Sequence, residues 1–223
     1  MFITNSTKNA QLSGYSVATS AAEKMRPGEK AMHNAFQFNQ YLLKRQVFAL
    51  TGKLRFYNPQ GDLILFSEQK MFKLREDIRV FADEQKTQEV LSIKARQIID
   101  FSAAYDVVDS TSGEKVGTLR RKGLKSILRD EWEVLDANDQ VIGALFEDNM
   151  GLAMLRRFVT GSLLPQNYDL TMNDQRVADL KQRFNPFRYD MDIDFSMDTV
   201  HRLDRRLGLA AAILLAIIEG RQD

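Results

Sequence analysis

The stretch Leu207–Ile218, with the sequence LGLAAAILLAII, decides the fold of this chain. As a helix it would carry no charged or polar side chain on any face. A helix that is apolar all round is buried in protein or in lipid. The helix is predicted to run to about Glu219, with Gly220 as its stop, and Ser196 or Asp198 as the cap at its start.

The length of this stretch distinguishes between the two environments. At about 1.5 Å per residue it rises roughly 18 Å, whereas the hydrocarbon core of a bilayer is about 30 Å thick and needs around 20 apolar residues. Extending the helix backwards brings in the charges of Arg202, Asp204, Arg205 and Arg206. We therefore expect a helix buried in the core of the protein. The alternatives are a membrane span, a tail anchor and a helix buried by a partner.

The chain before this helix has the pattern of a series of β-hairpins. Short runs with alternating apolar residues are separated by turn-forming residues, which is typical of antiparallel strands. Hairpins are predicted at 54–66, 105–119, 132–146 and 168–180, single strands at 91–95 and 188–195, and a short helix at 152–159.

A sheet that must cover every face of one helix is expected to curl around it. A closed barrel also removes the exposed edges of the sheet. Small barrels are filled by their own side chains, so the number of strands must be large enough to admit a helix. We predict a mostly β fold, in which a closed antiparallel barrel surrounds the buried C-terminal helix.

Composition narrows the class of protein. The 223 residues include 31 Lys and Arg against 30 Asp and Glu, a balance unlike that of a basic nucleic-acid binder. The absence of cysteine excludes disulfides, thiolate metal sites and cysteine nucleophiles. Residues 1–36 are predicted to be a polar, weakly ordered extension without the apolar core of a signal peptide, and residues 37–223 the barrel domain. We expect a cytoplasmic protein, either free or at a membrane surface.

The order of three hairpins and the terminal helix resembles one known family. The hairpins are Tyr105–Leu119, Trp132–Phe146 and Tyr168–Leu180, and the helix is Leu207–Ile218. In this order they resemble the LURP-one-related family, which belongs with the phospholipid scramblases to the tubby C-terminal-like superfamily. The resemblance covers about residues 38–219. It depends on the order of the elements, because the individual motifs are degenerate.

The resemblance implies a barrel of about twelve strands wrapped around the C-terminal helix, and a role other than catalysis. Tubby proteins bind phosphoinositides, and scramblases are membrane-associated proteins that are proposed to bind calcium. No tubby lipid-binding motif can be transferred residue by residue to this sequence. The resemblance therefore implies lipid or membrane binding as a class, without a particular ligand.

The sequence offers little for catalysis. His33 and His201 are its only histidines. Ser196 and Asp198 lie near His201 in the sequence, but one helix start cannot easily arrange a nucleophile, a base and an acid in a relay. The pattern GxGxxG after a strand and the pattern GxxxxGK[ST] do not occur. We expect a non-enzymatic protein without a cofactor.

Asp190, Asp192 and Asp194 have the spacing of the first ligands of a calcium-binding loop. The rest of the pattern departs from it, because Phe195 stands where the loop requires glycine and His201 where it requires a bidentate glutamate. The alternation of a strand with a solvated acidic face explains the same spacing. A divalent-ion site at the three aspartates is the alternative.

Basic residues lie beside apolar ones in two stretches of the sequence. Such a combination can hold an anionic membrane surface, and the other interpretation is a solvated loop and helix face. The candidates for contact with lipid headgroups are Arg120, Arg121, Lys122 and Lys125 between two hairpins, and Arg156 and Arg157 on the predicted short helix.

Three classes of function follow from these patterns. The first is a module that binds phospholipid, phosphoinositide or a membrane surface. The second is a protein-interaction or structural domain with no lipid role, and the third is a scramblase-like membrane-associated protein. The expected partners are accordingly an anionic phospholipid or membrane surface, or another protein, and no nucleic acid. The sequence does not indicate an oligomeric state.

Overall fold

The computed structural model describes residues 32–46, 51–70, 77–96, 103–122, 131–148, 165–185 and 187–218. Residues 32–223 form one compact unit. The short helix η1 (Asn34–Phe36) belongs to this unit, and Ala35 and Phe36 are part of its core. The short helix predicted at 152–159 lies outside the described residues.

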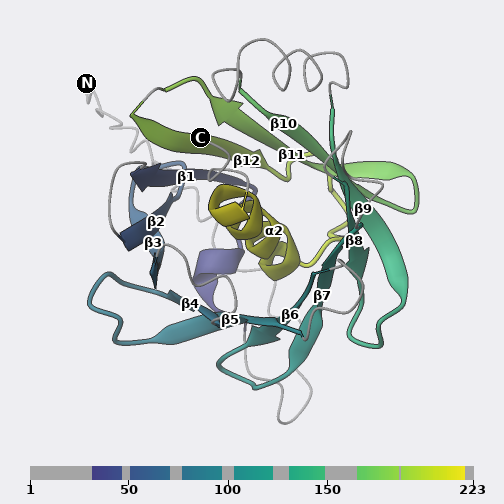
Figure 1. Cartoon of the computed structure of the whole chain (residues 1–223), viewed down its shortest axis with the longest axis horizontal. Helices are drawn as coiled ribbons and strands as arrows, with labels where there is room; N and C mark the ends of the chain where they lie inside the picture. The colour runs from purple at the N-terminus through teal and green to yellow at the C-terminus, as the bar shows by residue number, and fades with distance from the viewer. Residues whose placement is uncertain are drawn as a thin grey trace, which may run out of the picture. The chain divides into compact units, whose positions relative to one another are not determined.

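The described residues form twelve antiparallel strands in one closed barrel (Figure 1). Each strand pairs with the next along the chain, and β1 pairs with β12 to close the ring. The predicted mostly β, closed-barrel fold is confirmed. The bounds are β1 (Gln40–Gln46), β2 (Thr51–Tyr57), β3 (Leu63–Lys70), β4 (Ile78–Phe81), β5 (Glu89–Ala95), β6 (Ala104–Asp109), β7 (Lys115–Arg121), β8 (Glu131–Leu135), β9 (Val141–Glu147), β10 (Asn167–Met172), β11 (Gln175–Arg183) and β12 (Arg188–Asp194).

The helix α2 (Arg205–Ile218) lies inside the barrel (Figure 1). Leu209, Ile213 and Leu215 have no exposed surface, so the prediction of a buried core helix is confirmed. No helix among the described residues is long and apolar enough to cross a membrane. The core around α2 is supplied by buried residues of the strands, among them Leu43, Leu54, Ile93, Val107, Leu119, Val134, Leu145, Leu170, Leu180 and Met191.

The predicted cap of this helix was wrong. The helix starts at Arg205, and the preceding Asp204 caps it, because its carboxylate accepts from the backbone N–H of Arg206 at 2.9 Å. Ser196 and Asp198 lie in the linker between β12 and α2 instead. His201 in this linker has a φ of 51°, which a continuous helix does not allow.

A buried ion pair holds the start of α2. The Asp198 carboxylate accepts from the backbone N–H groups of Arg202 and Leu203, and its Oδ2 lies 2.9 Å from Nη1 of Arg205. The Arg205 guanidinium lies over the Phe195 ring, 4.7 Å from its centre. A buried ion pair is tolerated when its other hydrogen-bonding groups are satisfied. Asp198 meets this condition through the linker backbone.

The other end of α2 meets a buried arginine. Arg45 on β1 is 2% exposed, and its Nη1 donates to the carbonyl oxygen of Ala216. The last carbonyl groups of a helix have no partner within it, and a cation there complements the helix dipole. Arg45 therefore attaches the end of the helix to the barrel wall.

Gly208 lets α2 pass close to Phe195. A Cβ atom at position 208 would overlap the Phe195 ring and would lie 3.2 Å from a methyl carbon of Leu203. The glycine is needed here for space, because both neighbours are buried.

We expect Leu214→Lys to unfold or aggregate the protein. Leu214 is 1% exposed, and burying an unpaired charge costs several kcal/mol, a large share of a typical stability of about 5–15 kcal/mol. Circular dichroism and thermal melting measure the effect, with Leu214→Met as a control that should keep a cooperative melt. Deleting 207–223 should also abolish the β signal. A cooperative melt near the full-length value after this deletion would contradict the buried-helix structure.

We expect Gly208→Ala to destabilise the protein. Helix propensity alone favours alanine by about 1 kcal/mol, whereas overpacking a core costs about 1–3 kcal/mol. Denaturant titration should show a net loss of unfolding free energy. The double variant with Phe195→Leu should recover part of this loss, since the smaller side chain frees space. If the double variant instead loses the sum of the two single-variant losses of unfolding free energy, the contact between positions 208 and 195 is not the cause of the destabilisation.

We expect Asp198 to stabilise the fold at neutral pH and to lose this effect in acid. Burial raises its pKa, but hydrogen bonds from Arg202, Leu203 and Arg205 outweigh burial and leave the pKa below the ordinary value of 3.8. A pKa that is lower in the folded state gives stability above pH 3.8 that is lost as pH falls through the folded value.

The variant Asp198→Asn checks this. It should lower the unfolding free energy at pH 7 by roughly 3–5 kcal/mol, because Arg205 is left buried without its partner. The difference in unfolding free energy between the variant and the unaltered protein should become smaller as the pH falls below the ordinary carboxyl pKa. Glu114→Gln, on an exposed turn, is the matched control and should have little effect. A gap of equal size at all pH values would refute the role of the Asp198 charge.

Candidate functional site

Because the strands alternate in direction, their connections gather at the two ends of the barrel. We call one end the turn end; it holds the turns 58–62, 82–88, 110–114, 136–140 and 173–174 and the start of α2. We call the other end the loop end; there α2 ends and the strand termini Arg121, Glu131, Glu147, Arg183 and Arg188 lie.

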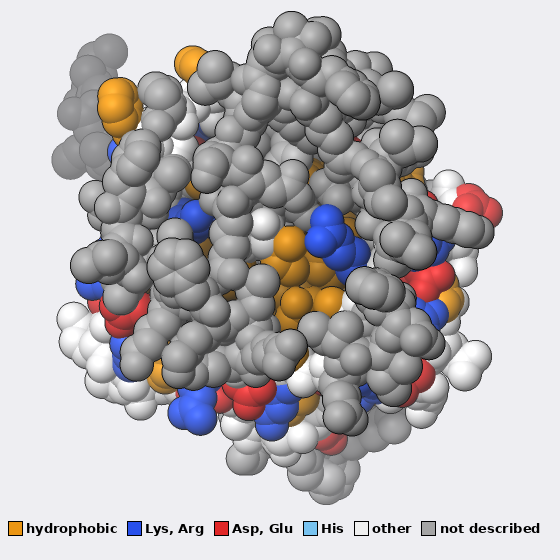
Figure 2. All heavy atoms as spheres, viewed as in Figure 1, with side chains coloured by type: hydrophobic (Ala, Val, Ile, Leu, Met, Phe, Trp, Pro, Cys, Tyr) orange, Lys and Arg blue, Asp and Glu red, His pale blue; other side chains and the backbone are white. Residues whose placement is uncertain are grey.

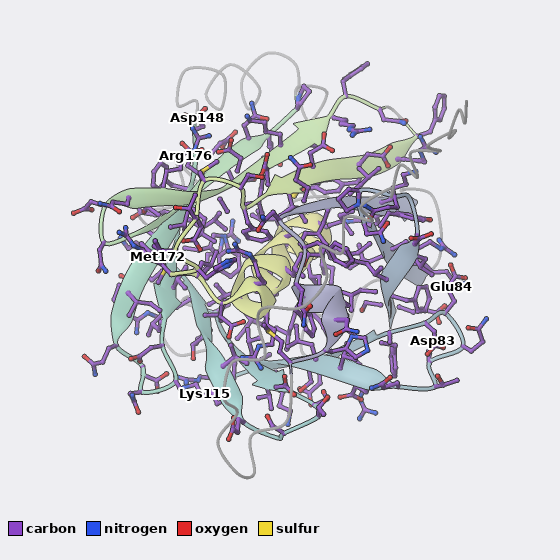
Figure 3. All side chains as sticks on the ribbon, turned by 180° about the vertical axis from the view of Figure 1, so that it is seen from behind. Asp83, Glu84, Lys115, Asp148, Met172 and Arg176 are labelled. Atoms are coloured by element: carbon purple, nitrogen blue, oxygen red, sulfur yellow. The ribbon has the colours of Figure 1, made fainter. Side chains whose placement is uncertain are left out.

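The turn end is polar and acidic. Its aspartates help to form the turns: Asp136 Oδ1 accepts from the backbone N–H groups of Asn138 and Gln140 at 2.8 and 2.9 Å. Figure 3 shows Asp83 and Glu84 at the edge of the ring of strands. The five turns contain a single basic residue, Lys86. Their acidic residues are Asp62, Asp83, Glu84, Glu114, Asp136, Asp139 and Asp174.

Two of the predicted headgroup residues lie on the outer face near the loop end and have acidic partners. Arg120 Nη2 is 2.6 Å from Glu133 Oε2, and Lys122 Nζ is 2.5 Å from Glu131 Oε1. The side chains of Arg120 and Lys122 are 42% and 35% exposed. Both cations therefore remain accessible to solvent, but neighbouring carboxylates compensate part of their charge.

Arg121 lies on the opposite face of the same strand. Its register partner is Trp132, which is 1% exposed and belongs to the core. Side chains alternate between the faces of a strand, so Arg121 faces inward while Arg120 faces outward. The predicted basic run is thus divided between the surface and the interior.

The remaining headgroup candidates, Lys125, Arg156 and Arg157, lie outside the described residues. The strands that flank their segments, β7 and β8 for Lys125 and β9 and β10 for the two arginines, end or begin at the loop end. Figure 2 shows hydrophobic side chains with Lys and Arg beside them at the centre of the face seen down the barrel.

The three aspartates of the calcium-like spacing lie along β12, and two of them, Asp190 and Asp192, take part in ion pairs. Asp192 accepts from Arg183 Nε and Nη2 at 2.7 and 2.6 Å, and Asp190 lies 3.2 Å from Arg188. Residues two apart on a strand are separated by about 6.6 Å, so these carboxylates do not converge. No acidic or histidine cluster among the described residues could hold a metal ion.

Asp194 accepts hydrogen bonds from two neighbours in the fold, Ser196 and Gln40. Burial raises its pKa, but hydrogen bonds from Ser196 and Gln40 outweigh it and hold the pKa below its ordinary value. Gln40 Nε2 donates to Asp194 Oδ2 at 3.1 Å, across the pair of strands that closes the barrel. The acidic face of β12 therefore contributes to strand pairing.

The two histidines have structural contacts. His33 Nδ1 accepts from the backbone N–H of Ala35 at 3.3 Å and caps η1. His201 Nδ1 lies 3.2 Å from Nη2 of Arg205, beside the start of α2. The structure does not bring the two rings into a relay with Ser196, whose backbone N–H donates to Asp194.

The sequence interpretation missed two sets of residues at the loop end. The first faces the interior: Arg45 and Glu147 are each 2% exposed. Strand alternation could have found them, because they lie two residues after the buried Leu43 and Leu145. The second set is the exposed pair Phe184 and Phe187 in the β11–β12 connection.

Comparison with known proteins identifies the family. A family model described as LURP-one-related matches residues 63–216, from the first residue of β3 almost to the end of α2. No curated protein and no solved structure matches the chain. The barrel closed around an apolar helix agrees with the resemblance seen in the hairpins. The chain belongs to the LURP-one-related family.

Proposed function

We propose that this chain is a non-enzymatic cytoplasmic module that binds anionic membrane surfaces through the loop end of its barrel. The observation that carries the proposal is the difference between the two ends. Acidic side chains concentrate in the turns of the turn end. The predicted headgroup cations belong to the strands and connections of the loop end.

The sequences of the connections support this orientation. The segments 47–50, 71–76, 97–102, 123–130 and 149–164 join strand termini of the loop end and lie outside the described residues. Together their sequences combine Phe, Leu, Ile and Met with Lys and Arg, whereas the five turns at the turn end contain none of these four apolar residues. Apolar and basic residues together suit the boundary between headgroups and acyl chains.

Electrostatics favours the same orientation. A cation near an anionic leaflet contributes about 1 kcal/mol, and the attraction falls off within a Debye length. The acidic turn end would be repelled by such a surface. A protein with this distribution should therefore approach an anionic membrane with its loop end first.

A protein-interaction domain is the second candidate function. The observation that favours it is the pairing of Arg120 with Glu133 and of Lys122 with Glu131. Paired surface charges attract a membrane less than free ones and can instead provide complementary contacts to a protein. A scramblase-like role receives less support, because Asp190 and Asp192 are engaged by arginines.

We expect the protein to co-sediment with vesicles that contain phosphatidylserine and not with vesicles of phosphatidylcholine alone. Binding should weaken as salt rises from about 0.1 M to 1 M, because the Debye length falls from roughly 10 to 3 Å. Lys122→Gln combined with Lys125→Gln should reduce binding by roughly thirtyfold, at about 1 kcal/mol for each of the two cations.

The matched control removes two cations at the turn end, Lys86 and Arg202. The variant Lys86→Gln with Arg202→Gln should bind as the unaltered protein does. Equal losses in both variants would contradict the loop end as the binding surface. Failure of the unaltered protein to bind anionic vesicles would reject the lipid proposal in favour of the protein-interaction domain.

A further inference from the structure

Two phenylalanines project from the connection between β11 and β12. Phe184 is 64% exposed and Phe187 is 71% exposed, the highest value for a large apolar side chain among the described residues. In the strands on either side, Leu180 and Tyr189 are buried in the core. Phenylalanine is usually buried in a folded protein, so an exposed pair in one short connection indicates a contact outside the domain.

The backbone of this connection is stabilised from within. Asn185 Oδ1 accepts hydrogen bonds from the backbone N–H groups of Phe187 and Arg188, at 2.9 and 3.1 Å. Backbone donors that lack a partner are costly to move out of water. Because Asn185 supplies the partner, Phe187 can enter a less polar environment without leaving its own N–H unsatisfied.

Arginines flank the two rings on both sides. Arg183 directly precedes Phe184 and Arg188 directly follows Phe187, and both arginine side chains are 53% exposed. Each has a carboxylate partner on β12, Asp192 for Arg183 and Asp190 for Arg188, and these contacts keep the guanidinium groups at the base of the connection. Apolar rings with cations directly behind them match the order of acyl chains and anionic headgroups in a leaflet.

The position of the pair also distinguishes it from the two most exposed valines. Val141 and Val200, 55% and 66% exposed, belong to the turn end, where Val141 follows the acidic turn 136–140. Phe184 and Phe187 belong to the loop end, with the termini of β7 and β8. The exposed aromatic rings therefore lie at the end of the barrel where the predicted headgroup residues also lie.

We propose that Phe184 and Phe187 insert into the interfacial region of an anionic bilayer, with Arg183 and Arg188 at the level of the headgroups. This inference rests on the proposed function and names the part of the loop end that enters the lipid. A second copy of the chain fits the pair less well, because it would have to cover the arginines as well as the rings.

The variant Phe187→Trp tests insertion directly. The only other tryptophan, Trp132, is 1% exposed and gives a constant background. With vesicles of phosphatidylcholine and phosphatidylserine, the emission of the new tryptophan should shift to the blue. Lipids with brominated acyl chains should quench it. Val141→Trp, at the turn end, is the matched control and should show neither effect.

A second pair of variants measures how much the two phenylalanines contribute to vesicle binding. Phe184→Ser with Phe187→Ser should keep the thermal melt of the unaltered protein, because both rings are exposed, and should weaken vesicle binding by about tenfold or more. Val141→Ser with Val200→Ser removes two apolar side chains of similar exposure from the turn end. This control should bind vesicles as the unaltered protein does.

The outcomes separate the inference from the proposed function. If the unaltered protein binds anionic vesicles, but the tryptophan at 187 is not quenched and the double serine variant binds normally, insertion is overturned and the proposed function stands. If the unaltered protein does not bind vesicles, both fail. A blue shift that appears with rising protein concentration and no vesicles would assign the rings to a second copy and overturn insertion.

Discussion

The need to cover every face of α2 determines the rest of this structure. An amphipathic helix can lie on one side of a sheet, but a helix with no polar face has to be enclosed. The chain meets this need with strands that pair in sequence order until β12 returns to β1. Closure also leaves no free sheet edge within the described barrel. The need to enclose α2 therefore accounts both for the apolar inner face of the sheet and for the pairing of its two edge strands.

A second requirement concerns the backbone groups at the two ends of the helix, which have no partner within the helix itself. Charged side chains supply partners at both ends. Asp204 and the Asp198–Arg205 pair hold the start, and Arg45 reaches the carbonyl of Ala216 at the finish. These contacts hold both ends of the helix in place.

The sequence was most informative where one periodic pattern had one physical outcome. The apolar stretch 207–218 required burial, and alternation with turn residues required hairpins, so the architecture could be predicted. The cap could not, because Ser196, Asp198 and Asp204 have similar capping chemistry and the contacts of the folded linker select among them. The partners of Arg120 and Lys122 likewise depend on the register of β7 against β8. The inward position of Arg121 could have been predicted, because Arg121 follows the buried Leu119 by two residues and residues two apart on a strand lie on the same face.

The order of elements along the chain has a consequence for biosynthesis. The strand that closes the ring pairs with the first strand, as the contact between Gln40 and Asp194 shows, and the helix that fills the ring follows all twelve strands. While the chain is still being made, its hairpins can form, but they enclose nothing and have no final neighbour. The nascent protein thus exposes the apolar side of an open sheet until α2 leaves the ribosome. Its folding is completed after synthesis of the last helix, and chaperones that cover apolar surface are most useful to it before that moment.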